Sequence, residues 1–85
     1  MKNQIFTVYD SKAAAFLQPF FSPTVQSGQR AFAQACSDPA TMLYQYSSDY
    51  ILWHVGAFDD VTGDLVKLEA PANLGLATQY KGAQS

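Results

Sequence analysis

The segment from Asp49 to Glu69 constrains the fold of this chain most, because its pattern is that of two β-strands joined by a turn. Residues 59–64 are rich in Asp and include Gly63, where we expect a positive φ. Leu65–Glu69 then returns as the partner strand, and Pro71 is expected to end it. Along the first strand, alternation places Tyr50, Leu52, His54, Gly56 and Phe58 on one face and Ile51, Trp53, Val55 and Ala57 on the other.

Two more strands are predicted near the N-terminus. Gln4–Tyr9 is β-branched and aromatic on both faces, which is typical of a well-buried strand. Ala13–Phe21 is ambiguous, because its alanines favour a helix while Pro19 and the spacing of its phenylalanines fit neither state. We prefer a strand at the edge of the sheet, since proline lacks the N–H that a central strand donates.

One helix is predicted after Ser22, which suits the N-cap, with Pro23 at the first helical position. Gly28 within this helix costs up to about 1 kcal/mol relative to Ala, unless a neighbouring strand packs closely there. The helix is expected to end at residues 37–39, because the residue before Pro39 is disfavoured in the α region. Its apolar stripe consists of Val25, Phe32, Ala35 and Cys36.

The rest of the chain contributes little predicted structure. Residues 40–48 suggest a short helical turn or a loop, and residues 72–77 a short turn of helix. The order β-β-α-β-β predicts a small α+β domain over residues 1–77, an antiparallel sheet with one helix packed on a face. Residues 78–85 are expected to form a flexible C-terminal tail. A chain of 85 residues has room for one core.

The charge content points to self-association and away from a protein that coats nucleic acid. Only 14% of the residues are charged, against about 25% in an average globular protein, so a lone subunit should expose apolar surface. We therefore expect a homodimer. The net charge of −2 argues against strong phosphate binding unless the basic residues converge in space or across a dimer. They are Lys2, Lys12, Arg30, Lys67 and Lys81.

No catalytic or metal-binding pattern is evident. Cys36 is the only cysteine and His54 the only histidine, which excludes an intrachain disulfide and a multi-cysteine metal site. The two side chains would have to meet in space to act as a nucleophile and base, and packing roles fit them better. The acidic turn at residues 59–64 lacks the ligand spacing of a calcium loop and fits a solvated turn. We expect no enzyme activity, metal or cofactor.

The aromatic residues allow two interpretations. Trp53 and several tyrosines would form a stacking platform for single-stranded nucleic acid if basic residues lay beside them. Their neighbours in the sequence include Asp49, Asp59 and Asp60 instead, so we favour a core and a dimer interface. Neither a signal peptide nor a membrane span is expected, and the single cysteine suits a reducing cytoplasm.

Taken together, the segments resemble a family of small nonstructural proteins of gokushovirus-like microviruses, which are single-stranded DNA phages. The resemblance covers about residues 1–76 and depends on the order and spacing of several segments. These are Met1–Lys12, Ala15–Phe21, Arg30–Phe32, Asp38–Pro39, Asp49–Asp59, Thr62–Gly63 and Leu68–Pro71.

The resemblance implies a protein that is absent from the mature virion and acts in the bacterial host cytoplasm during DNA replication. We predict a non-enzymatic accessory protein that supports genome replication or single-stranded DNA synthesis. It would bind DNA or a replication protein of the phage or host; the alternative is an assembly or host-interaction protein with no nucleic-acid contact. Candidate DNA-binding residues are Lys2, Lys12, Arg30, Trp53 and Lys67. Candidate interface residues are Phe20, Phe21, Tyr50 and Trp53.

Overall fold

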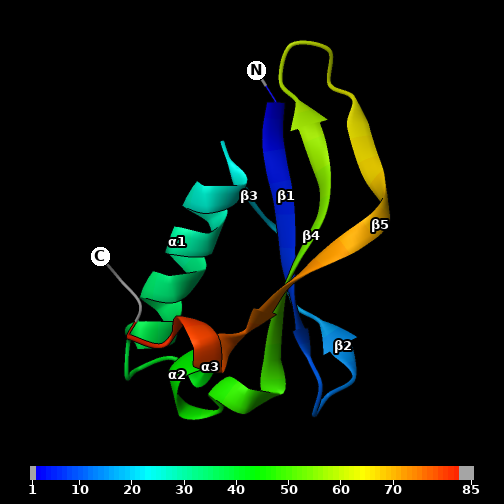
Figure 1. The fold of residues 1–85 in the computed structure, drawn as a ribbon. Helices are drawn as coiled ribbons and strands as arrows, with labels where there is room; N and C mark the ends of the chain where they lie inside the picture. Colours follow the sequence, from blue (N-terminus) through cyan, green and yellow to red (C-terminus); the bar gives the residue numbers. More distant parts are fainter. Residues whose placement is uncertain (1, 83–85) are drawn as a thin grey trace.

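The computed structural model describes residues 2–82 and shows a twisted antiparallel sheet whose helices gather on one side (Figure 1). Four strands lie in the order β2-β1-β4-β5, and β3 pairs with β1 as well. The predicted α+β class is therefore confirmed, with more short elements than β-β-α-β-β. The elements are β1 (Lys2–Asp10), β2 (Ala15–Phe16), β3 (Phe20–Ser22), α1 (Val25–Ser37), α2 (Met42–Gln45), the 3-10 turn η1 (Ser47–Asp49), β4 (Tyr50–Asp59), β5 (Leu65–Leu76) and α3 (Ala77–Tyr80).

The ambiguous segment after β1 forms two short strands rather than one. β2 pairs with the end of β1 through Tyr9 and Phe16, and β3 pairs with its first half through Ile5 and Phe21. Pro19 lies between β2 and β3, where no ladder hydrogen bond is required of it. The prediction of extended structure beside β1 is correct, and the proline explains the interruption.

Helix α1 begins later than predicted, because Ser22 belongs to β3. Thr24 is the N-cap: its hydroxyl accepts a hydrogen bond from the Ser27 N–H at 3.0 Å, and the Ser27 hydroxyl accepts one from the Thr24 N–H. This reciprocal capping box satisfies two of the N–H groups that a helix start leaves unpaired. The helix ends at Ser37, as the following Asp38–Pro39 predicts.

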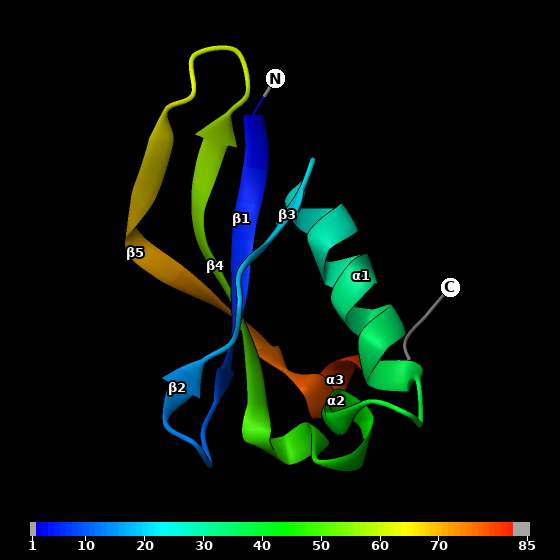
Figure 2. The ribbon, with the colours of Figure 1, turned by 180° about the vertical axis from the view of Figure 1, so that it is seen from behind.

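The core lies between the sheet and the helices. Figure 2 shows these two layers from behind. Phe6 and Leu52 are fully buried, and the Phe6 ring stacks on Phe20 at 5.3 Å between centroids. The apolar stripe of α1 meets this layer, as predicted. The buried cluster comprises Phe6, Val8, Phe32, Cys36, Tyr50, Leu52 and Ala77.

Strand β5 runs through Pro71, where the sequence predicted its end, and it also replaces the short helical turn expected at residues 72–77. Gly56 pairs with Lys67, but His54 pairs with Ala72, so residues 68–71 of β5 have no register partner on β4. Pro71 is tolerated because it falls in this irregular stretch of an edge strand.

The same irregularity corrects the predicted faces of β4. Both partners of β4 shift register near residue 55, between Ile5 and Phe6 on β1 and between Lys67 and Ala72 on β5. An extra residue in a strand rotates the side chains that follow onto the other face. Phe58, predicted on the face of Leu52, therefore contacts Phe21 on the opposite face.

Helix α3 extends the packed structure beyond residue 77. The sequence predicts a flexible tail over residues 78–85, whereas residues 77–80 are helical. The Tyr80 hydroxyl donates to the Leu74 carbonyl at 2.6 Å, and its ring meets Phe32 edge-on at 5.2 Å. Residues 83–85 lie outside the described residues.

Candidate binding surface

The face of the sheet turned away from the helices carries most of the accessible apolar side chains of the strands. Alternation from Leu52 and Val8, which point into the core, directs Trp53 and Tyr9 to this side. Leu65 is 70% exposed, and Phe21 is 53% exposed. We call this surface the open face and define it by Ile5, Tyr9, Phe21, Trp53, Phe58 and Leu65.

Two shallow hollows mark the part of the open face nearest the hairpin turn. One, of about 390 Å³, lies between Asn3, Phe21, Phe58 and Leu65. The other, of about 320 Å³, is lined by Ile5, Val55, Gly56, Leu65, Val66 and Lys67. The Phe21 and Phe58 rings meet at 79° and 6.1 Å between centroids, an edge-to-face contact that supports the first hollow.

Trp53 occupies the middle of the open face and is partly buried. Its register partners are Thr7 on β1 and Asn73 on β5. The indole Nε1 is buried and makes no hydrogen bond within residues 2–82. Because Trp53 is the only tryptophan of the chain, its fluorescence reports on this face alone.

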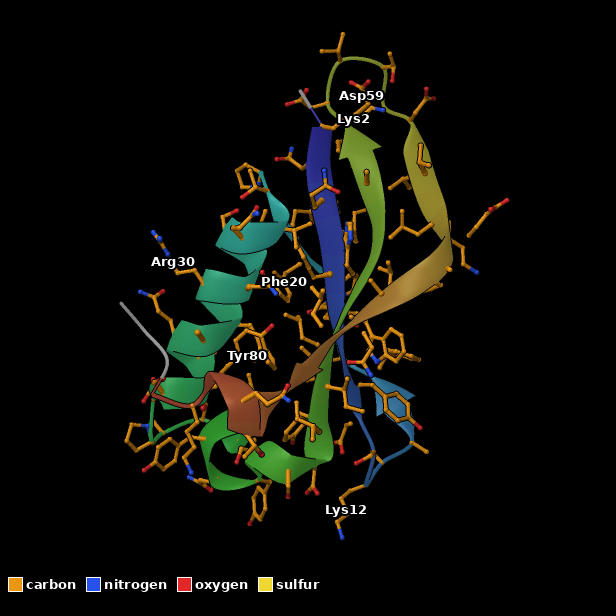
Figure 3. The ribbon with its side chains drawn as sticks, viewed as in Figure 1. Lys2, Lys12, Phe20, Arg30, Asp59 and Tyr80 are labelled. Carbon is orange, nitrogen blue, oxygen red and sulfur yellow. The ribbon has the colours of Figure 1, made fainter. Side chains whose placement is uncertain are left out.

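The candidate DNA-binding cations do not converge within one subunit. Lys2 begins β1, Lys12 lies in the turn beyond its other end, and Arg30 points from α1 away from the sheet (Figure 3). Lys67 is the one cation of this set beside the open face, as part of the second hollow. Lys81, which was not in the set, lies 4.0 Å from the ring centroid of Tyr44. One chain thus presents separate positive charges rather than a basic patch.

The candidate interface residues divide between the core and the surface. Tyr50 is 6% exposed and belongs to the core, and Phe20 packs against the core through its stacking on Phe6. Burial, reinforced by Asp10 and Asp49, raises the pKa of the Tyr50 hydroxyl.

Phe21 and Trp53 remain on the open face, where Phe58 and Leu65 join them. The sequence did not single out these two, because Phe58 reaches this face through the bulge in β4 and Leu65 follows it as its register partner on β5.

The potentially reactive side chains occupy packing positions. Burial raises the pKa of the Cys36 thiol to about 11, which leaves it protonated at neutral pH. His54 Nε2 lies 2.9 Å from Gln4 Oε1, and its ring lies against Phe6. Since an amide oxygen only accepts, the histidine donates from Nε2.

The acidic turn between β4 and β5 uses its first aspartate to hold the backbone. Asp59 Oδ1 accepts hydrogen bonds from the N–H groups of Val61 at 2.9 Å and Thr62 at 3.4 Å. The Val61 N–H, with smaller contributions from Thr62 and Lys2, lowers the pKa of Asp59 against an opposing effect of burial. Gly63 has the predicted positive φ, at 79°. The two hydrogen bonds to Asp59 Oδ1 are those expected of an Asx turn.

Among residues 2–82, no three His, Cys, Asp or Glu side chains come together in a group that would hold a metal ion. None of the helices in this part of the chain has the length and hydropathy needed to cross a membrane.

Comparison with known proteins assigns the chain to a family. A family model described as phage ORF5 protein matches residues 3–80, which is nearly the whole chain. Comparison with curated proteins and with solved structures gives no match. The phage origin expected from the sequence is thereby confirmed, while its narrower assignment to microviruses stays a prediction. Because this match extends over residues 3–80, the chain belongs to the phage ORF5 protein family.

Proposed function

We propose that this phage protein is a non-enzymatic, nonstructural accessory protein of a microvirus that supports genome replication in the host cytoplasm. It would do so by holding a replication protein of the phage or host against its open face. The observation that carries this proposal is the contrast between an exposed apolar sheet face and the dispersed cations around it.

The open face suits a protein partner because its exposed side chains are aliphatic and aromatic. Phe21, Phe58 and Leu65 surround a hollow into which a partner side chain would insert. Aromatic anchors of this kind contribute most of the binding energy at protein interfaces. Lys12 and Arg30 lie away from the hollow, and Lys2 beside it is paired with Asp59 across the strands, which leaves little local charge to attract a phosphate backbone.

A non-enzymatic role is supported by the state of the reactive groups. Cys36 lies in the core, and burial raises its pKa to about 11. Only a small fraction of this thiol is therefore ionised and able to act as a nucleophile. His54 is held by Gln4 rather than by a hydroxyl, thiol or carboxylate.

The test is direct binding of the purified phage replication initiator, measured by Trp53 fluorescence and by calorimetry. Phe21→Ser should weaken binding at least about tenfold, as expected for loss of a buried aromatic anchor. Val61→Ser is the matched control, because Val61 is 80% exposed at the hairpin turn and lies off the open face. Equal affinity of the two variants would contradict the role of the open face.

Single-stranded DNA is a second candidate ligand, favoured by the aromatic rings of the open face and by Lys67 beside them. Bases would stack on Trp53 and Phe21, as they do on other sheet platforms. Fluorescence anisotropy of a labelled oligonucleotide at low and moderate salt distinguishes the two candidates, since phosphate binding weakens steeply with salt. If neither DNA nor the initiator binds, the protein would act in phage assembly or on another host protein.

A further inference from the structure

The outer edge of β5 is a free strand edge within residues 2–82. β5 is the last strand in the order β2-β1-β4-β5, and its first half follows the outer margin of the sheet (Figure 1). Val66 is 51% exposed, and Lys67 and Glu69 are exposed as well. An exposed edge of this kind is a template for pairing with another strand.

We propose that a second copy of this chain pairs with this edge, so that the two β5 strands run antiparallel about a two-fold axis at Leu68. Lys67 and Glu69 are both exposed and lie two residues apart, a spacing that puts them on one face where the paired strand is extended. Pairing about Leu68 brings each Lys67 opposite Glu69 of the partner subunit, which forms two symmetric ion pairs.

Charge selects this register over its neighbours. An axis at Lys67 would oppose two lysines, and an axis at Glu69 would oppose two glutamates; like charges directly across a ladder are destabilising. Only about Leu68 is this segment complementary to itself. On the other side of the strand, each Val66 meets Ala70 of the partner subunit, so that apolar side chains also match across the axis.

Other features of this edge limit the strength of the dimer. Lys67, Pro71 and the irregular residues 68–71 resemble the devices by which monomeric proteins protect an edge. Pro71 would lie opposite Leu65 of the partner subunit, and its missing N–H ends the ladder there. The pairing therefore covers residues 65–71 and falls among small interfaces, below about 1,200 Å² in total, that are weak and concentration-dependent.

Charge exchange tests the pairing, with subunit mass measured by sedimentation equilibrium over a range of concentrations. Lys67→Glu alone and Glu69→Lys alone should each raise the dimer dissociation constant at least about tenfold, because each replaces two attractions by two repulsions. The double variant should restore the wild-type value. Lys12→Glu, a charge reversal at an exposed site away from β5, should leave it unchanged.

A cysteine pair tests the register. Leu68→Cys places two thiols across the axis, within the Cα separation that a disulfide spans, and should give a covalent dimer under mild oxidation. Val66→Cys should not, because the two positions would lie about 13 Å apart along the strands. Wild-type protein is the control for Cys36, which is buried.

Monomeric wild-type protein at every concentration, unchanged dimerisation in the single charge variants, or equal cross-linking at positions 66 and 68 would each overturn the proposal. Circular dichroism verifies that the variants are folded. Leu65 belongs both to the β5 edge and to the Phe21 hollow, but the variants at positions 67 and 69 leave Phe21 and Phe58 unchanged, so failure of this test leaves the proposed partner binding on the open face intact.

Discussion

Gly28 of α1 lies against the ring of Phe6 on β1, so closely that a Cβ at this position would overlap the ring. The glycine that weakens the helix locally is therefore the residue that lets the helix approach the sheet. The Phe6 ring fills the space under the helix and stacks on Phe20. The sequence predicts a cost for Gly28 within the helix unless a neighbouring strand packs closely there, and β1 packs in this way.

Gly28→Ala should destabilise the protein although alanine is the better helix former. The gain of up to about 1 kcal/mol in helix propensity is outweighed by overpacking against Phe6, which costs about 1–3 kcal/mol. Urea unfolding followed by circular dichroism measures the difference. Gln34→Ala, at an exposed site of the same helix, should change the free energy of unfolding by less than about 0.5 kcal/mol. A stabilised Gly28→Ala variant would contradict the close contact.

Tyr80→Phe should loosen the C-terminal helix. The Tyr80 hydroxyl donates to the Leu74 carbonyl and accepts from Gln29 Nε2 at 3.0 Å, so its loss leaves two partners of the hydroxyl unpaired. We expect a loss of about 1–2 kcal/mol in the free energy of unfolding. Tyr46→Phe, at a tyrosine that is 51% exposed, is the matched control and should be nearly neutral. Equal effects in the two variants would show that α3 is not held by this hydroxyl.

Cys36 should resist alkylation in the native protein. Its pKa of about 11 leaves about one thiolate in a thousand at pH 8, and the side chain is fully buried. In buffer, iodoacetamide should label Cys36 only as fast as the whole domain unfolds. In concentrated urea it should label Cys36 rapidly. Mass spectrometry of timed samples gives both rates. Rapid labelling without denaturant would indicate an accessible, activated thiol and reopen the question of catalysis.

The hairpin turn should weaken in acid through Asp59. Hydrogen bonding by Val61 lowers the folded-state pKa of Asp59 below its usual value of about 4. Its contribution to stability is therefore complete above pH 4 and is lost as the pH falls through the lowered pKa. The difference in stability between wild type and Asp59→Asn should shrink over that interval. An NMR titration of the Asp59 carboxyl checks the direction, and a pKa above the usual value would contradict it.

Local patterns were sufficient to predict much of this fold. The alternation of residues 50–58, the glycine of the following turn and the proline after α1 each act through the backbone of a few neighbouring residues. The predicted hairpin, the positive φ of Gly63 and the end of α1 at Ser37 were accordingly confirmed.

The candidate site was less predictable, because it depends on which side of the sheet the helices cover. Phe21 and Phe58 form the hollow of the open face, yet Phe58 reaches that face only through the register shift in β4. Nothing in its own sequence distinguishes it from Leu52, which is buried. The cations likewise show their dispersion only when the strands and α1 are placed in space.

The sequence by itself determined the elements whose signals are local: the central hairpin, the amphipathic helix and the α+β class. Only the tertiary structure decided that Thr24 rather than Ser22 caps α1, that β5 passes through Pro71, and that Tyr80 belongs to the packed domain. The physical reason is that each of these depends on partners distant in sequence. Ser22 pairs with Gln4, β5 gains its ladder from β4, and Tyr80 bonds Gln29 across 51 residues.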